Sequence, residues 1–75
     1  MIFKIRLEST QDAEEFVKEA TKCGGDVDLH SGVVYIDGKS LLGVLAMGIK
    51  RDLNVYVSER DDDSFKNAVE KFVVA

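Results

Sequence analysis

The sequence predicts an α/β fold of the α+β type, with the element order β-α-β-β-α-β-α and a four-stranded antiparallel sheet that carries three helices on one face. Four segments alternate apolar and polar side chains, which is typical of strands with one wet face. Three other segments repeat apolar residues at helical spacing. A chain of 75 residues has room for only one core, so we predict a single domain over residues 1–75.

The first two elements are a strand and a helix. Residues 2–7 alternate apolar and charged side chains, which predicts a strand from Ile2 to Leu7. Ser9-Thr10-Gln11-Asp12 has the pattern of a capping box, in which the serine hydroxyl and the aspartate carboxylate accept hydrogen bonds from free amides. Gly24-Gly25 ends the helix. Its apolar face is predicted to consist of Ala13, Phe16, Val17 and Ala20.

A β-hairpin is predicted next, over residues 26–36. Its two strands flank Ser31-Gly32, a pair suited to a two-residue turn. Such a turn would pair His30 with Val33 and Leu29 with Val34. The apolar face of the hairpin would then consist of Val27, Leu29, Val34 and Ile36.

The second helix is predicted from about Ser40 to Gly48, and no polar side chain occurs between Ser40 and Lys50. A helix in so small a domain can bury only one stripe. Some of these apolar side chains should therefore face water, with a hydroxyl and a lysine at the edge of the exposed patch. This predicts a docking site for a partner.

The last two elements are a strand and a helix. Residues 53–58 alternate as a fourth strand. Asp61-Asp62-Asp63 then places negative charge at the positive end of a helix and lacks the spacing of a calcium loop. The apolar stripe of this helix is predicted to be Phe65, Ala68, Val69, Phe72 and Val73.

Composition limits the kinds of binding partner and the cellular location that we expect. The net charge is −4 and the lysines are dispersed, which argues against nucleic acid and anionic membranes as partners. The start of the chain lacks a signal-peptide core, and the apolar run Leu41–Ile49 is far short of the roughly 20 residues of a membrane span. We therefore expect a cytoplasmic protein. Cys23, the single cysteine, is expected to be a core residue without a disulfide or a metal.

The sequence contains no recognisable combination of catalytic residues. His30 is the single histidine and is expected to be an exposed turn residue, so neither a Ser/His/Asp nor a Cys/His arrangement can form. Gly38-Lys39-Ser40 matches the end of a phosphate-binding P-loop, but Val33 stands where that motif needs a glycine. We predict a protein that is not an enzyme and has no cofactor and no metal.

The segment Lys39–Ile49, together with the element order, resembles HPr, the phosphocarrier of the bacterial sugar phosphotransferase system. The resemblance spans nearly the whole chain and implies an HPr-like open-faced β-sandwich. In that family a histidine in a Gly-x-His-x-Arg-Pro-Ala loop carries the phosphoryl group. The corresponding stretch here, Leu7–Ala13, is shorter and has no His, Arg or Pro. Glu8 and Asp12 would repel a phosphate.

The resemblance also implies a site on the second helix. In many Gram-positive members the serine that matches Ser40 is a regulatory phosphorylation site, and the helix that follows it docks partner proteins. Homologues that have lost the histidine and kept this serine act as regulators, and an HPr kinase or a sugar-operon regulator would be a partner. The partner-binding residues would be Lys39, Leu41, Leu42, Leu45 and Met47.

A ferredoxin-like regulatory domain that binds a small molecule is the alternative, because β-α-β-β-α-β fits the first six elements equally well. In that fold the second helix would be longer and amphipathic, and binding would depend on a dimer interface. The third helix and the exposed second helix distinguish the two.

Overall fold

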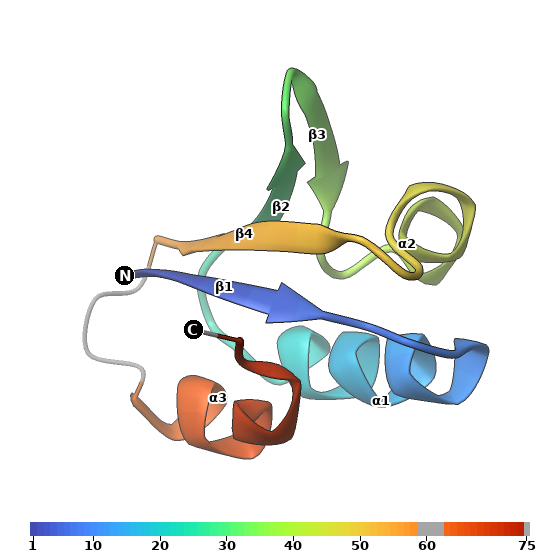
Figure 1. The fold of residues 1–75 in the computed structure, drawn as a ribbon. Helices are drawn as coiled ribbons and strands as arrows, with labels where there is room; N and C mark the ends of the chain where they lie inside the picture. The colour runs from blue at the N-terminus through green and yellow to red at the C-terminus, as the bar shows by residue number, and fades with distance from the viewer. Residues whose placement is uncertain (59–62, 75) are drawn as a thin grey trace.

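Four strands form one antiparallel sheet in the order β1-β4-β2-β3 in the computed structural model, which describes residues 1–58 and 63–74. Helices α1 and α3 lie side by side on one side of the sheet, and α2 lies near the start of β4, in contact with α1 and β3 (Figure 1). The α+β class and the order of elements are confirmed. The elements are β1 (Ile2–Arg6), α1 (Thr10–Thr21), β2 (Val27–Ser31), β3 (Val34–Asp37), α2 (Leu41–Met47), β4 (Asp52–Val57), α3 (Asp63–Ala68) and the 3₁₀ turn η1 (Glu70–Phe72).

The core lies between one face of the sheet and the helices. Alternate residues of the strands point into it, so Ile5 of β1 and Val55 of β4 are fully buried. From the helix side, Phe16 of α1 meets the ring of Phe65 of α3 edge to face, with centroids 5.6 Å apart. This arrangement confirms the predicted one-sided sheet, whose opposite face carries no described helix.

Helix α1 begins as its sequence predicts. Ser9 is the N-cap, and its Oγ accepts a hydrogen bond from the Asp12 amide at 3.1 Å. The Asp12 carboxylate accepts from the Glu8 amide at 3.0 Å, so two backbone donors are satisfied at this end. The predicted apolar face is confirmed, since its four residues are buried.

The hairpin register differs from the prediction by one residue at the turn. His30 pairs with Tyr35 and Ser31 with Val34, so the two turn residues are Gly32 and Val33. Gly32 has a φ of +60°, which a type II′ turn requires at its first central residue and which glycine adopts without strain. The predicted turn would have put the less permissive Ser31 at that position. The apolar face nevertheless keeps its predicted members.

The last helix is shorter than predicted. α3 ends at Ala68, and the chain continues in the tighter 3₁₀ geometry of η1. This change rotates Ala68 into solvent and places Val69 and Phe72, three residues apart, in the core. The prediction that Ala68 lies on the buried stripe is therefore wrong. Asp61 and Asp62, predicted to begin this helix, lie outside the described residues.

Both features that distinguish the ferredoxin-like alternative argue against it. Helix α2 is short, with seven residues, and exposes Leu42 and Met47, and a third helix, α3, is present. The alternative fold is therefore wrong. Within residues 1–58 and 63–74, no helix has the length and apolar character needed to cross a membrane.

Candidate functional site

The segment that leads into α2 is held tightly against the sheet. The Gly38 amide donates to the carbonyl oxygen of Val27 at 2.7 Å, and a Cβ atom on Gly38 would lie 2.7 Å from the Val27 side chain. The next turn is closed by the Ser40 amide, which donates to the Asp37 carbonyl oxygen at 3.0 Å. The start of α2 is thus fixed in position by backbone contacts.

Ser40 is the N-cap of α2, as predicted. Its backbone is extended, and its Oγ accepts a hydrogen bond from the Gly43 amide at 3.3 Å. The hydroxyl is half-buried at the point where the helix begins. Gly48 ends the helix, and its amide donates to the Val44 carbonyl oxygen at 2.7 Å. Both predicted ends of this helix are confirmed.

The apolar side chains of α2 divide into inner and outer groups. Val44 is fully buried, whereas Leu42 is 80% exposed and Met47 is 37% exposed. Leu41 and Leu45 are half-buried and pack against the edge of the core. The prediction that some apolar side chains of this helix face water is confirmed, but of the four expected to bind partners only Leu42 and Met47 are exposed. Leu41 and Leu45 are partly covered because α2 contacts both α1 and β3.

Lys39 lies next to the patch but its ammonium group has a structural partner. Lys39 Nζ donates to the carbonyl oxygen of Cys23 at 2.9 Å, near the end of α1. Its backbone amide donates to Asp37 Oδ1 at 2.9 Å. Lys39 therefore ties the start of α2 to the end of α1. Cys23 itself is buried, as predicted.

The connection between β1 and α1 contains the carboxylates of Glu8 and Asp12 and the serine that caps α1. Arg6 Nε donates to Glu8 Oε2 at 2.8 Å, and this hydrogen bond raises the pKa of the Arg6 guanidinium. Ser9 is used as the cap of α1. The Lys50 amide donates to the Leu7 carbonyl oxygen at 2.7 Å, so this connection lies beside the end of α2.

His30 lies far along the chain from this connection and in a setting that the sequence analysis missed. It belongs to β2, is half-buried, and stacks between two tyrosines. The Tyr35 ring is 3.8 Å from its ring, centroid to centroid, and the Tyr56 ring is 4.0 Å away. The expectation of a solvated turn histidine is therefore wrong. The alternation of β2, β3 and β4 places all three rings on one face, and that pattern could have indicated the cluster.

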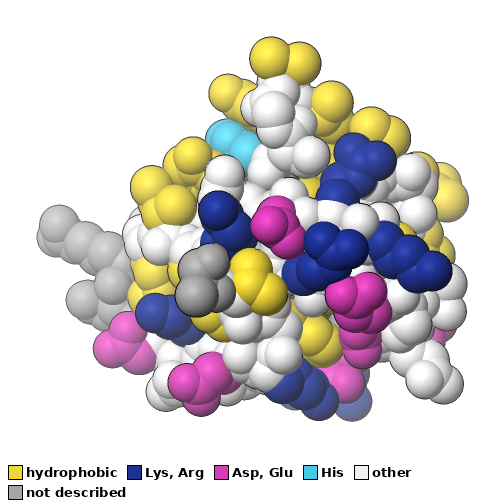
Figure 2. Space-filling view, viewed as in Figure 1, with side chains coloured by type: hydrophobic (Ala, Val, Ile, Leu, Met, Phe, Trp, Pro, Cys, Tyr) yellow, Lys and Arg dark blue, Asp and Glu magenta, His cyan; other side chains and the backbone are white. Residues whose placement is uncertain are grey.

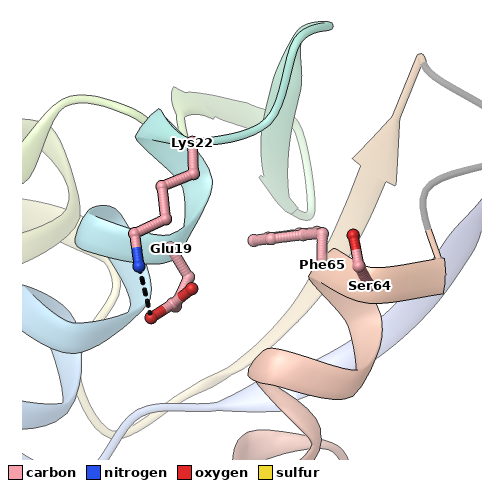
Figure 3. Close-up of a pocket in the computed structure, with 4 residues that line it drawn as sticks. All are labelled: Glu19, Lys22, Ser64 and Phe65. Atoms are coloured by element: carbon pink, nitrogen blue, oxygen red, sulfur yellow. Dashed lines mark hydrogen bonds and ion pairs between the residues drawn. The ribbon is translucent and has the colours of Figure 1, made fainter.

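A pocket of about 240 Å³ opens between the end of α1 and the start of α3 (Figure 3). Lys22 Nζ and Glu19 Oε2 pair across 3.4 Å on one wall, and Ser64 and Phe65 form the other. The predicted site residues do not line it. Among the described residues, no three His, Cys, Asp or Glu side chains form a group that could hold a metal ion.

A family model matches residues 9–74, which is nearly the whole chain. It is the model described as the PTS HPr component phosphorylation site. No curated protein sequence matches the chain.

Several solved structures share the fold. The histidine-containing phosphocarrier protein of Mycoplasma has a TM-score of 0.76 at 20% identity, and the match covers 95% of this chain and 89% of that one. The phosphocarrier protein HPr of Bacillus anthracis has a TM-score of 0.73 at 17% identity, over 99% and 96%. The Bacillus subtilis catabolite repression protein Crh, described as a swapped dimer, has a TM-score of 0.68 at 18% identity, over 95% and 88%. These likenesses show the open-faced HPr fold.

Proposed function

This chain belongs to the HPr family of phosphocarrier proteins of the sugar phosphotransferase system, and we propose that it is a regulatory member that binds protein partners through α2 and does not carry phosphate on histidine. It would act as a binding module and not as an enzyme. One observation carries the proposal: Ser40 caps α2, and the exposed Leu42 follows it by two residues on the same helix.

Leu42 supports a role in partner binding. Its side chain is 80% exposed on a helix whose start is held by Ser40 and Gly38, so it is presented in a fixed position. An exposed leucine contributes little to the free energy of folding. Together with Met47 and the outer edges of Leu41 and Leu45, it forms an apolar surface of the kind that a protein partner covers.

The connection between β1 and α1 supports the absence of a phosphohistidine. A phosphocarrier needs an imidazole nucleophile with hydrogen-bond donors around the phosphoryl oxygens. This connection presents the Glu8 and Asp12 carboxylates, and its amides and Ser9 hydroxyl are used in capping α1. His30 is stacked between tyrosines on the sheet, where the neighbouring Asp28 would repel a phosphoryl group.

Phosphorylation of Ser40 would regulate this surface. A phosphate would add about two negative charges beside Leu41 and Leu42. Partners that cover the patch with apolar groups alone would be penalised, and partners that bring an arginine or lysine would be favoured. Because the ammonium of Lys39 is bonded to Cys23, the partner has to supply this cation.

The partners that we propose are an HPr kinase and a sugar-operon regulator. We also propose a cytoplasmic location. Nucleic acid and membrane surfaces are not expected as partners, because a net charge of −4 with dispersed lysines argues against a basic surface for phosphates.

The experiment that tests the regulatory site uses a Gram-positive HPr kinase with ATP. We expect one added phosphate by intact mass, with its position at Ser40 by peptide mapping and no incorporation in Ser40→Ala. The thermal melt and amide NMR spectrum should keep the pattern of a folded protein. Incorporation at Ser9 or Ser31, or no incorporation at all, would contradict the proposed site. Loss of the folded spectrum on phosphorylation would contradict the claim that the phosphate acts on partner choice.

A second experiment tests the absence of a phosphohistidine. The protein is incubated with phosphoenolpyruvate and enzyme I of the sugar system, next to a histidine-containing HPr as positive control. We expect no added mass, because the donor would meet Glu8 and Asp12 at the position of the family's histidine. An acid-labile phosphate that disappears in His30→Ala would overturn the proposal.

A further inference from the structure

Asp37 and Gly38 form the one place in the sequence where a glycine follows an aspartate or an asparagine. Such a pair is chemically reactive, because glycine has no Cβ atom to keep its backbone nitrogen away from the preceding side-chain carboxyl. Asp37 ends β3, and Gly38 begins the turn that leads into α2. A reaction at this pair would therefore change how α2 is joined to the sheet.

The reaction open to such a pair is closure of a cyclic imide. The Gly38 nitrogen loses its hydrogen and bonds to Cγ of the protonated Asp37 carboxyl, the C–OH bond breaks, and one water leaves. Water then adds to one of the two ring carbonyls and breaks its bond to nitrogen. Opening at the side-chain carbonyl restores aspartate. Opening at the backbone carbonyl gives isoaspartate, in which the main chain runs through the side chain and is one atom longer.

The peptide unit between Asp37 and Gly38 is held at both of its polar atoms. The Gly38 amide donates to the Val27 carbonyl oxygen at 2.7 Å, and the Asp37 carbonyl oxygen accepts from the Ser40 amide at 3.0 Å. Ring closure needs this unit to rotate until its nitrogen faces the side-chain carboxyl. That rotation would break both hydrogen bonds, so the folded chain opposes the reaction.

The side-chain carboxyl and the space around Gly38 are restricted as well. Asp37 Oδ1 accepts from the Lys39 amide at 2.9 Å, which is an Asx turn. Gly38 is buried, and a Cβ atom on it would lie 2.7 Å from the Val27 side chain. The peptide unit has no room to rotate towards β2, so ring closure requires the segment to move away from the sheet.

Helix α2 is the element whose opening would release this segment. It follows Gly38 closely in the chain, and of its seven residues Val44 is the buried one. A short element with few buried side chains opens locally at a smaller cost in free energy than the whole fold. When α2 opens, the Ser40 amide leaves the Asp37 carbonyl oxygen, and one of the two restraints on the peptide unit is lost.

We propose that Asp37-Gly38 is a modification site that the fold protects and that isomerises when α2 opens. The isoaspartyl chain cannot close again in the same way, because the added backbone atom displaces Gly38 from the Val27 carbonyl oxygen. The displacement passes to α2, where Figure 2 shows hydrophobic side chains at the right of the molecule. The exposed Leu42 and Met47 then lose their fixed position.

The test is the rate of isoaspartate formation at residue 37 in the full chain, followed at neutral pH by peptide mapping with electron-transfer fragmentation. We expect the rate in native buffer to be at least about tenfold lower than in concentrated urea, where the peptide unit rotates freely.

Three valine-to-alanine variants locate the opening that controls the rate. Val44→Ala removes the buried side chain of α2 and should raise the rate in buffer at least about tenfold. Val33→Ala, at an exposed position, should leave the rate unchanged, and Val69→Ala, in the core beside η1, should raise it less than Val44→Ala. Amide NMR checks that each variant is folded, and all three should react alike in urea. If Val44→Ala does not fold, Ser40→Ala, which removes the cap of α2, takes its place.

A second measurement tests the product. The isoaspartyl chain formed in urea is separated and returned to buffer. We expect amide NMR to show β1 and β4 still paired, with the amides of Gly43 and Val44 in α2 exchanging faster than in the unmodified chain.

Four results would overturn the proposal. One is an equal rate for the wild type in buffer and in urea, since the fold would then give no protection. Another is a folded α2 variant that reacts at the wild-type rate. A third is a rate in Val69→Ala as high as in Val44→Ala, because global unfolding would then control the reaction. The last is an isoaspartyl chain whose Gly43 and Val44 amides exchange as in the wild type. None of these outcomes depends on phosphorylation of Ser40.

Discussion

Helices α1 and α2 begin with the same serine cap, but α1 presents a charged surface to water and α2 presents an apolar one. In both, a serine hydroxyl accepts a hydrogen bond from the amide three residues later, Asp12 in α1 and Gly43 in α2. The outer face of α1 is charged, and its Glu15 pairs with Lys71 of η1. The outer face of α2 carries Leu42 in place of such charges.

This difference between the outer faces is matched by a difference in how many side chains each helix buries in the core. Helix α1 buries four side chains over its 12 residues, while α2 buries only Val44 over its seven. Leu41 and Leu45 add partial burial at the edge of the core, so only the exposed Leu42 and Met47 are not explained by stability. These two outer residues are the ones that the proposed partner binding would use.

The largest expected effect contrasts the buried face of α1 with the outer face of α2. Phe16→Ala should lower the free energy of unfolding by about 3–5 kcal/mol, because it leaves a cavity at a fully buried site. Leu42→Ala should change it by less than about 0.5 kcal/mol. Urea unfolding followed by circular dichroism measures both. Equal losses for the two variants would mean that α2 is as much a core element as α1.

An intermediate effect is expected where the chain enters α2. Gly38→Ala would bring a Cβ atom to 2.7 Å from the Val27 side chain and 2.8 Å from its carbonyl oxygen. The backbone has to shift, at an expected cost of about 1–3 kcal/mol. Gly32 has no atom within 4 Å of its Cβ position but has a positive φ, so Gly32→Asn, which tolerates that backbone, is the matched control. A Gly38→Ala variant as stable as this control would show that the entry to α2 is loosely held.

The smallest expected effect concerns the two caps. Ser9→Ala and Ser40→Ala should each lower the free energy of unfolding by about 1 kcal/mol, because each leaves a helix amide without its acceptor. Ser40→Asp should keep the wild-type value, since aspartate is an equally good cap and adds charge at the positive end of the helix.

Thermal melts of the three variants compare them directly. A loss in Ser40→Asp as large as in Ser40→Ala would show that the start of α2 does not accept negative charge, and it would weigh against regulation by phosphate at this position. A loss confined to Ser9→Ala would mean that only α1 depends on its cap.

Much of the fold was predictable because local signals agreed. Ser40 and Gly48 mark the ends of α2, and the alternation of β4 matches its buried face. The hairpin register was not predictable from hydrophobic pattern. Moving the turn by one residue shifts the pairing by two, which leaves the same side chains on the same face. Only the positive φ of Gly32 distinguishes the two turns.

The candidate site was predictable in position and less so in detail. The run of apolar residues after Ser40 predicted exposed side chains on α2, which Leu42 and Met47 confirm. The partial burial of Leu41 and Leu45 depends on how α2 rests between α1 and β3. The bond from Lys39 to the Cys23 carbonyl joins groups 16 residues apart through a long flexible side chain. Such a contact is set by tertiary packing, and local sequence carries no signal for it.

The position of β1 in the sheet has a consequence for folding. Its ladder partners are residues 52–56 of β4, and its other edge is covered by Val73 and Val74, whose amide donates to the Lys4 carbonyl oxygen. β1 therefore cannot complete its hydrogen bonds until β4 and residues 73–74 have been synthesised. At synthesis rates of about 5–20 residues per second this delay lasts several seconds. Phe3 and Ile5 remain exposed to water during that interval. Their burial in the nascent chain depends on contacts between segments far apart in the sequence, which form late.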